Sequence, residues 1–229
     1  MLGVVLPSGQ AAARGLRRAG ALRVSGDPVS DSYNQFISSM TLTFDQGHDG
    51  EGYDLEALGR CGDDEKKHAA RVLADKLLTG GGWRDIDALE TLGFAIAWPP
   101  LLQAYLKHPD LEIRLRAGLI LEDWKAPVSV DVESMIVDVI RESEAGRLTY
   151  MLHMAEARPT PKVRAALLER VRDGDSTTRV HCAAMLLYLA GKAKEPFDWA
   201  HRPFFLRFGE DGPDRDKAFE ELKQRIGFK

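Results

Sequence analysis

Hydrophobic residues in this chain recur every three or four positions and do not alternate with polar ones. In residues 33–44 the apolar side chains fall at i, i+3, i+4, i+7 and i+11. These side chains are Tyr33, Phe36, Ile37, Met40 and Phe44. The spacing predicts an amphipathic helix that Ser30 or Asp31 caps.

Two more helices are predicted in the first hundred residues. The segment "DDEKKHAARVLADKLL" (63–78) has Asp63 or Asp64 as its expected cap. It should stop at "TGGG", since glycine tolerates the left-handed conformation of a helix end. Its buried stripe is predicted to comprise Ala69, Val72, Leu73 and Leu77. The following helix lies in "WRDIDALETL", with Asp85 as its expected cap.

The sequence predicts an all-α protein, because no window alternates apolar and polar residues long enough to indicate a sheet. The stretch "HRPFFLRF" would form one short strand at most. From Trp98 onward the predicted helices come in pairs. The pairs are 99–107 with 110–123, 131–143 with 145–157, and 161–173 with 175–190.

The second helices of these pairs repeat one pattern. The segments "DLEIRLRAGLIL", "SEAGRLTYMLHM" and "DSTTRVHCAAML" align without gaps on Arg114, Arg147 and Arg179, which are 33 and then 32 residues apart. An aliphatic residue follows each arginine. One helix pair cannot bury its apolar face alone, so a repeat of this kind predicts stacked neighbours. We expect the three arginines to bond to neighbouring helix ends and to be structural.

An acid, a short spacer, an arginine and an Ala- and Leu-rich run together resemble the HEAT repeat of armadillo-like α-solenoids. The resemblance covers residues 85–190 and departs from the pattern at Gly146 and Tyr150. It implies an α-solenoid of antiparallel helix pairs. The organisation expected is a disordered tail (1–29), a helical N-terminal module (30–82), HEAT-like repeats (83–190) and an aromatic C-terminal cap (191–229).

The flanking stretches "DGEGYDLEAL", "WRDIDALETLG" and "PFDWAHRPFFLRF" resemble a group of small bacterial HEAT-repeat proteins. Some proteins of that kind are immunity proteins that neutralise secreted toxins. The resemblance implies a non-enzymatic scaffold that binds another protein, with no cofactor. A structural adaptor in a larger assembly remains an alternative.

Equivalent positions of the repeats form polar columns, which are candidate partner-binding residues. The columns contain Arg116, Thr149 and His181; Glu112, Ala145 and Thr177; and Asp123, Glu156 and Tyr188. In HEAT-like stacks the second helices tend to line the concave side, which is where a partner would bind. The alternative is an ordinary solvated helix face. His153 shares its column with Ile120 and Met185, which predicts semi-buried packing.

The C-terminal aromatic residues have two possible roles. The cluster comprises Phe197, Trp199, Phe204, Phe205 and Phe208. It is expected to cover the open end of the solenoid with a last helix over 214–226, because terminal repeats need caps. That helix should turn Ala218, Phe219, Leu222 and Ile226 inward. Contact with a partner is the alternative, since aromatic residues are enriched in binding hot spots.

The stretch "FDQGHDGEGYDLEAL" places Asp45, Asp49, Gly50 and Glu56 at positions 1, 5, 6 and 12 of an EF-hand-like loop. Gly47 supplies no side-chain oxygen at position 3, and Gly59 and Gly62 interrupt the exit helix. We therefore interpret the stretch as a turn in which Asp54 caps a short helix, and we expect no metal site.

Charge and composition narrow the function. The net charge of −4 lacks the positive excess that phosphate binding needs, which argues against nucleic acid. A HEAT-like enzyme of the DNA-glycosylase type, or one acting on a small ligand, is the alternative, because four tryptophans and many carboxylates are present. Pro99 and Pro100 break the longest uncharged run, so no membrane span is expected. The isolated Cys61 and Cys182 favour a reducing cytoplasm.

Overall fold

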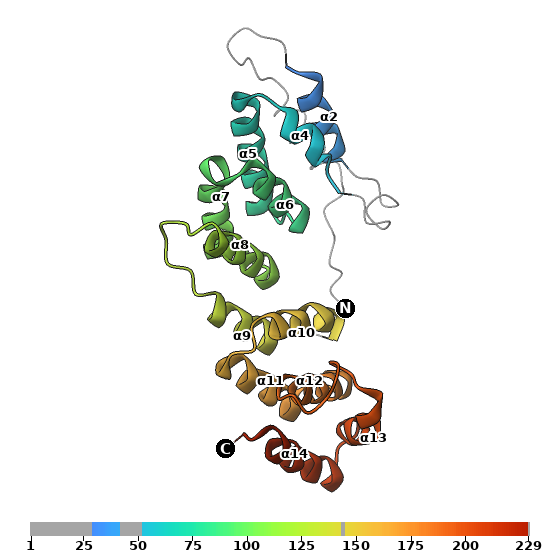
Figure 1. The fold of residues 1–229 in the computed structure, drawn as a ribbon. Helices are drawn as coiled ribbons and strands as arrows, with labels where there is room; N and C mark the ends of the chain where they lie inside the picture. The colour runs from blue at the N-terminus through green and yellow to red at the C-terminus, as the bar shows by residue number, and fades with distance from the viewer. Residues whose placement is uncertain (1–28, 42–51, 143–144, 229) are drawn as a thin grey trace, which may run out of the picture. The chain divides into compact units, whose positions relative to one another are not determined.

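The computed structural model describes residues 29–41, 52–142 and 145–228, and every regular element within those ranges is helical, as predicted (Figure 1). The chain divides into two compact units, Met1–Val128 and Ser129–Lys229. The expected tail, apart from Val29, and residues 44–51 of the EF-hand-like stretch lie outside the described residues.

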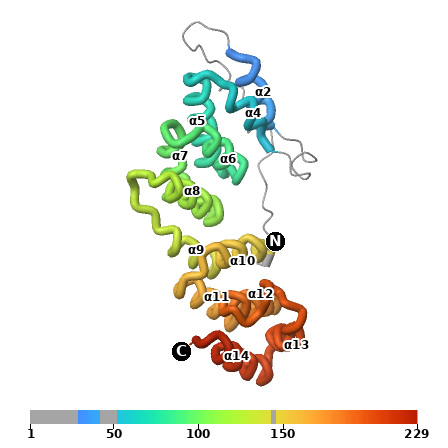
Figure 2. The backbone as a smooth tube through the Cα atoms, in the orientation of Figure 1, coloured from blue at the N-terminus to red at the C-terminus, as the bar shows by residue number. Residues whose placement is uncertain are grey.

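Helices of the first unit follow one another with short connections (Figure 2). They are α2 (Asp31–Ser39), α4 (Leu55–Arg60), α5 (Asp63–Leu78), α6 (Trp83–Leu92), α7 (Phe94–Lys107) and α8 (Leu111–Asp123). The contacts run α2 to α4, α4 to α6, α5 to α6 and α7, and α7 to α8. The core includes the fully buried Phe36, Leu73, Ile86, Leu101 and Leu115.

Two of the predicted caps are confirmed. The Ser30 Oγ accepts a hydrogen bond from the Tyr33 amide at 3.1 Å, and the Asp54 carboxylate accepts one from the Ala57 amide at 2.8 Å. Each side chain satisfies an amide that has no partner within its helix. Glu56 forms an i,i+4 ion pair with Arg60 on the exposed face of α4. Glu56 is the residue at position 12 of the EF-hand-like pattern, and here its carboxylate pairs with an arginine.

The predicted caps of α5 and α6 are wrong. Helix α5 is preceded by Gly62, whose amide donates to Glu65 at 3.0 Å, so Asp63 and Asp64 lie within the first turn. Glu65 also accepts from the Ser30 amide at 2.8 Å, which joins α2 to α5. In both helices an acid three residues into the helix reaches back to a glycine amide, and a side chain at the cap position itself becomes unnecessary.

Asp85 is this acid in α6 and is only 1 % exposed. Its Oδ2 accepts from the Gly82 amide at 2.8 Å, and its Oδ1 accepts from the Tyr53 hydroxyl at 2.8 Å. Lys76 Nζ lies 3.4 Å from the same Oδ1 and also contacts the Tyr53 hydroxyl. Burial, and then the Asp85 charge, raise the pKa of Tyr53, so the hydroxyl stays protonated as a donor. The cluster joins the start of α4, the end of α5 and the start of α6.

The connection between α5 and α6 needs its glycines. Gly80 has a φ of +99°, a backbone conformation that residues other than glycine rarely adopt. A Cβ on Gly81 would lie 2.7 Å from Asp85 Oδ2 and 3.0 Å from the Leu77 backbone. The predicted helix stop at "TGGG" is therefore confirmed. Gly80 is needed for its positive φ, and Gly81 is needed because Asp85 packs closely against it.

Helix α7 begins at Phe94, five residues before the predicted start, and contains Pro99 and Pro100. The prolines remove the amides that would bond to the carbonyls of Ala95 and Ile96. Those carbonyls belong to the first turn, where Ala95 is exposed and water is available. Two prolines are thus tolerated inside the helix.

The second unit contains two contacting helix pairs and a C-terminal helical segment (Figure 1). Its elements are α9 (Val132–Glu142), η1 (Ala145–Arg147), α10 (Leu148–Ala157), α11 (Pro161–Asp173), α12 (Ser176–Leu189), η2 (Trp199–His201), α13 (Arg202–Phe205), η3 (Leu206–Phe208) and α14 (Pro213–Ile226). Helix α9 contacts α10 and α11, while α12 contacts α10, α11 and α14. The predicted pairs 131–143 with 145–157 and 161–173 with 175–190 are therefore present.

The short strand considered for "HRPFFLRF" is absent, since these residues form parts of η2 and η3 with α13 between them. Phe204, Phe205 and Phe208 are buried, and η3 contacts both α12 and α14. On α14, Ala218 and Leu222 are buried as predicted, whereas Phe219 and Ile226 are half-buried. His153 is exposed, so its predicted packing is wrong.

Replacing Asp85 by alanine should lower the free energy of unfolding by about 2–4 kcal/mol, because the buried Tyr53 hydroxyl and Gly82 amide lose their acceptor. Tyr53→Phe should cost about 1 kcal/mol. Denaturant unfolding followed by circular dichroism measures both. Glu90→Ala, on the exposed side of α6, is the matched control and should change stability by less than about 0.5 kcal/mol. Equal effects of Asp85→Ala and Glu90→Ala would contradict the assignment.

Candidate interaction site

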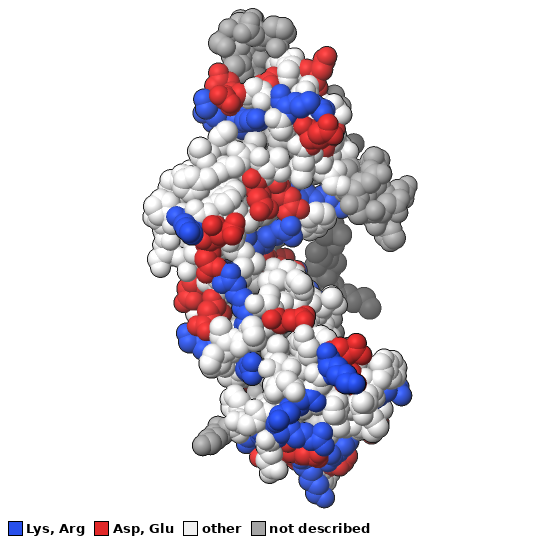
Figure 3. Space-filling model, viewed as in Figure 1, with Lys and Arg blue, Asp and Glu red and all other residues white. Residues whose placement is uncertain are grey.

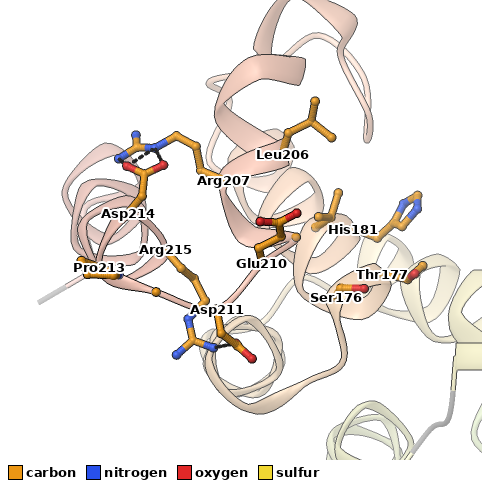
Figure 4. A pocket seen from close by; sticks show the side chains of 13 residues that line it. Ser176, Thr177, His181, Leu206, Arg207, Glu210, Asp211, Pro213, Asp214 and Arg215 are labelled. Atoms are coloured by element: carbon orange, nitrogen blue, oxygen red, sulfur yellow. Dashed lines mark hydrogen bonds and ion pairs between the residues drawn. The ribbon is translucent and has the colours of Figure 1, made fainter.

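A hollow of the second unit lies between the start of α12 and the segment that joins η3 to α14 (Figure 4). Its volume is about 700 Å³. Its lining comes from Ser176, Thr177, Val180 and His181 on α12, and from Leu206, Arg207 and residues 209–215. We call this hollow the α12 pocket.

Arg179 fixes the wall of the α12 pocket from within the core. It is 7 % exposed, and its Nε donates to the Phe208 carbonyl at 3.0 Å. The guanidinium also donates to Asp211 at 2.9 Å and to the Gly209 carbonyl at 3.4 Å. A buried guanidinium needs such acceptors, so this residue and the segment 208–211 hold each other in place.

Two arginines of the repeat, Arg114 and Arg179, form the bonds that were expected of them. Arg114 Nε donates to the Tyr105 carbonyl near the end of α7 at 3.0 Å, and Arg179 bonds to the end of η3. Arg147 is exposed in η1. The structural role predicted for Arg114 and Arg179 is confirmed by these bonds.

Charges at the rim of the pocket are largely paired. Arg207 forms ion pairs with Asp214 at 3.1 Å and with Glu221 at 2.6 Å. Arg215 forms an ion pair with Asp211 at 2.6 Å. Figure 4 shows the first and the last of these pairs. The hydrogen bond from Arg207 lowers the pKa of Glu221. Figure 3 shows acidic and basic side chains mixed over the C-terminal helices. The site therefore offers oriented polar groups and no strong field of one sign.

Apolar side chains continue from the pocket onto the surface. The His181 ring lies 5.1 Å from that of Phe197, which in turn lies 6.3 Å from that of Trp199. Trp199 is 67 % exposed and Leu206 is 52 % exposed. We call His181, Phe197, Trp199 and Leu206 the Trp199 surface. Arg202 lies over the Trp199 ring with its guanidinium carbon 5.1 Å from the centroid.

The predicted partner-binding residues are distributed over both units. Thr177 and His181 line the α12 pocket, and Tyr188 is half-buried farther along α12. Thr149 and Glu156 are exposed on α10, which contacts α12. The structure thus brings two of the eight together in one hollow.

The other three predicted residues lie on α8 in the first unit. Arg116 forms an ion pair with Asp87 of α6 at 2.5 Å. Burial raises the pKa of Asp87 more than Arg116 lowers it. Glu112 is half-buried in the first turn of α8, and Asp123 is exposed at its end. Arg116 already has a structural partner, which weakens its claim as a binding residue.

Several residues of the site were not predicted as site residues. They are Leu206, Arg207, Glu210, Asp211, Asp214 and Arg215. The signal in the sequence is "FGEDGPDRD", a charged turn between an aromatic cluster and a helix. The repeat alignment ends before this stretch, so columns taken from the repeats cannot include it.

Neither cysteine is an activated nucleophile; Cys182 lies on α12 of the second unit, and Cys61 follows α4 in the first unit. Burial raises the pKa of Cys182 to about 12 and also raises that of Cys61, and both thiols are free. Burial lowers the pKa of His181. In the described ranges, His181 forms no hydrogen bond with a serine, threonine or cysteine, and no three metal-ligating side chains gather. The arrangement offers contact area and directed polar groups.

Comparison with protein-family models, with curated proteins and with solved structures finds no match to this chain. Among the helices described, none combines the length and hydropathy that crossing a lipid bilayer requires.

Arg179→Met should lower the free energy of unfolding by about 2–4 kcal/mol, because the carbonyls at the end of η3 lose a buried donor. Hydrogen exchange of residues 206–211 should accelerate. Arg215→Met removes the other contact of Asp211 at the surface and should cost less than about 1 kcal/mol. Unchanged exchange in Arg179→Met would show that the loop holds its shape without this residue.

Stability should fall as the pH is lowered through about 6.5, the usual pKa of histidine. The pKa of His181 is lower in the folded state, so the unfolded state binds the proton first. The loss levels off below the folded pKa. His181→Gln should reduce the decrease in Tm between pH about 7.5 and pH about 5.5.

His68 contributes in the same direction, because burial and then Arg71 lower its pKa, so His68→Gln should have a similar effect. His153→Gln, at an exposed position, is the control and should leave the pH dependence unchanged. A Tm profile that neither His181→Gln nor His68→Gln alters would contradict this explanation.

Proposed function

We propose that this chain is a non-enzymatic protein-binding scaffold whose partner contacts the Trp199 surface and the adjoining α12 pocket. The contacting helix pairs and the repeated arginine pattern support the further proposal that the fold is a HEAT-like solenoid. Neutralisation of a cognate bacterial toxin is the specific role that we propose. It rests on the resemblance of the flanking sequences to a group of small bacterial HEAT-repeat proteins, some of which are immunity proteins.

One observation carries the proposal: Trp199 and Leu206 are 67 % and 52 % exposed beside a segment that Arg179 holds in place. Large apolar side chains on a fixed support lose little conformational entropy when a partner covers them. Tryptophan and arginine are also the residues most enriched in hot spots, and Arg202 lies against Trp199.

The paired rim suits a protein partner. Arg207, Asp211, Asp214 and Arg215 are already oriented by one another, so few side chains would have to be ordered on binding. Glu210 is exposed and makes no ion pair with any described residue. A partner that places a lysine or arginine there would gain a salt bridge without breaking one.

The aromatic cluster can serve both predicted roles. The buried Phe204, Phe205 and Phe208 pack under α12 and α14, which supports a capping role for them. Trp199 lies on the outside of the same segment. Capping and binding are therefore divided between different members of the cluster.

Trp199→Ala should abolish capture of the partner from an extract of the source organism, with the full chain immobilised and the retained proteins compared by mass spectrometry. Trp83→Ala is the matched control, because it removes another exposed tryptophan with an arginine against its ring. A protein retained by the wild type and by Trp83→Ala, but not by Trp199→Ala, would support the site. Equal retention by all three, or by none, would contradict it.

Toxin neutralisation has its own test. If a secreted toxin is encoded beside this gene, its co-expression with the wild-type chain should restore growth, and co-expression with Trp199→Ala should not. Growth arrest that the wild-type chain leaves unchanged would remove the toxin from the proposal and leave the binding site standing.

A further inference from the structure

The first unit has an open groove between α5 and α7. A hollow of about 420 Å³ is lined by Ala70 and Ala74 of α5 and by Ile96 and Pro100 of α7. A second hollow shares Ala74 and Pro100 and continues to Leu78, which is 54 % exposed. We call the two together the α5–α7 groove.

The groove is long enough to bind a helix. Its α5 wall uses Lys67, Ala70, Arg71, Ala74 and Leu78, which recur at i, i+3, i+4, i+7 and i+11. From Lys67 to Leu78 the wall spans eleven helical steps, or about 16 Å at 1.5 Å per residue. Such a wall matches about three turns of a docked helix. The alanines leave room for close approach.

Every charged residue that lines the groove is basic. These residues are Lys67, Arg71 and Lys107, in a chain whose net charge is −4. Lys67 pairs with Asp64 at 3.0 Å, but both side chains are exposed and such a pair holds little energy. Arg71 and Lys107 form no ion pair with any described residue.

This charge separates the groove from the rim of the α12 pocket, where acids and bases neutralise one another. An apolar floor between two helices, bordered by cations, complements a helix that carries an apolar stripe flanked by acids. A nucleic acid would need a longer series of cations and would gain little from the apolar floor. In Figure 3 a broad uncharged area lies around α7 on the surface of the first unit.

We propose that the α5–α7 groove binds an acidic amphipathic α-helix of a partner protein, with apolar side chains on Ala70, Ala74, Ile96 and Pro100 and carboxylates toward Arg71 and Lys107. This is a second interaction surface, in the unit that does not contain Trp199. The groove binds the acidic helix whether or not a partner occupies the Trp199 surface.

The probe is a fluorescent helical peptide of about 18 residues, with leucine and alanine at i, i+3, i+4 and i+7 and glutamate on both flanks. The comparison peptide has lysine at every glutamate position. Fluorescence anisotropy with the full chain should show saturable binding of the glutamate peptide and at least about tenfold weaker binding of the lysine peptide. Added salt should weaken the first interaction.

Two variants locate the site without disturbing the core. Arg71→Glu reverses an exposed charge, and Ala95→Glu places an acid on the groove in the first turn of α7, where it favours the helix. Each should weaken binding of the glutamate peptide by about tenfold or more. Lys217→Glu makes the same charge reversal on the exposed face of α14 and should have no effect. Tm measurements confirm that each variant is folded.

Four results would overturn the proposal. The first two are equal binding of both peptides and undiminished binding of the glutamate peptide to Arg71→Glu. The third is binding of a short single-stranded oligonucleotide, and not of the peptide, that Arg71→Glu abolishes. The fourth is a dimer of the chain, seen in sedimentation, that Arg71→Glu dissociates. Trp199→Ala should leave the peptide affinity unchanged. Failure here is therefore distinguishable from failure of the proposed function.

Discussion

The desolvated guanidinium of Arg179 is the constraint on which the C-terminal surface depends. A buried cation is stable only where acceptors surround it, and here two of them are the backbone carbonyls of Phe208 and Gly209. Backbone acceptors cannot rotate away as side chains can. The end of η3 is therefore fixed, and with it Leu206 on the outside and Phe205 and Phe208 on the inside. Arg179 thus fixes the backbone from which both the exposed and the buried side chains of this segment project.

Asp85 has a similar structural role in the first unit, as a buried charge that is held by several partners. Its carboxylate has donors from three places, the Gly82 amide, the Tyr53 hydroxyl and Lys76, and it is buried where these places meet. Removing any donor leaves part of a buried charge uncompensated, so the three helices hold one arrangement. Helix α5 contacts both α6 and α7, and α6 also contacts α7. The polar cluster therefore stabilises the packing of α5 on α6, next to the groove that α5 forms with α7.

Helical periodicity predicts the longer helices, because each has one face in a core, but it misses the first five residues of α7 and the short helix α13. Ser30 and Asp54 were predictable as caps, since their partners lie three residues away. The place of Asp85 at the start of α6 is predictable, but its role is not, because its donors include Tyr53, 32 residues away. The repeat register found Arg179 and the pocket residues Thr177 and His181, but not Asp211 or Arg215. Those lie beyond the last repeat, where only the folded chain places them beside α12.

The exposure of Trp199 is maintained by the surrounding backbone. The Asp198 carboxylate accepts from the Lys194 and Ala200 amides at 3.1 and 2.9 Å, which fixes the turn into η2. Phe197, the preceding aromatic residue, packs on His181 and Phe205, so the adjacent inward position is occupied. A tryptophan in a mobile loop could fold back onto the unit and cover its ring. Here the turn directs it outward, and Arg202 covers one face while the rest meets water. An apolar surface held open in this way costs hydration free energy in the isolated chain, which a bound partner would recover.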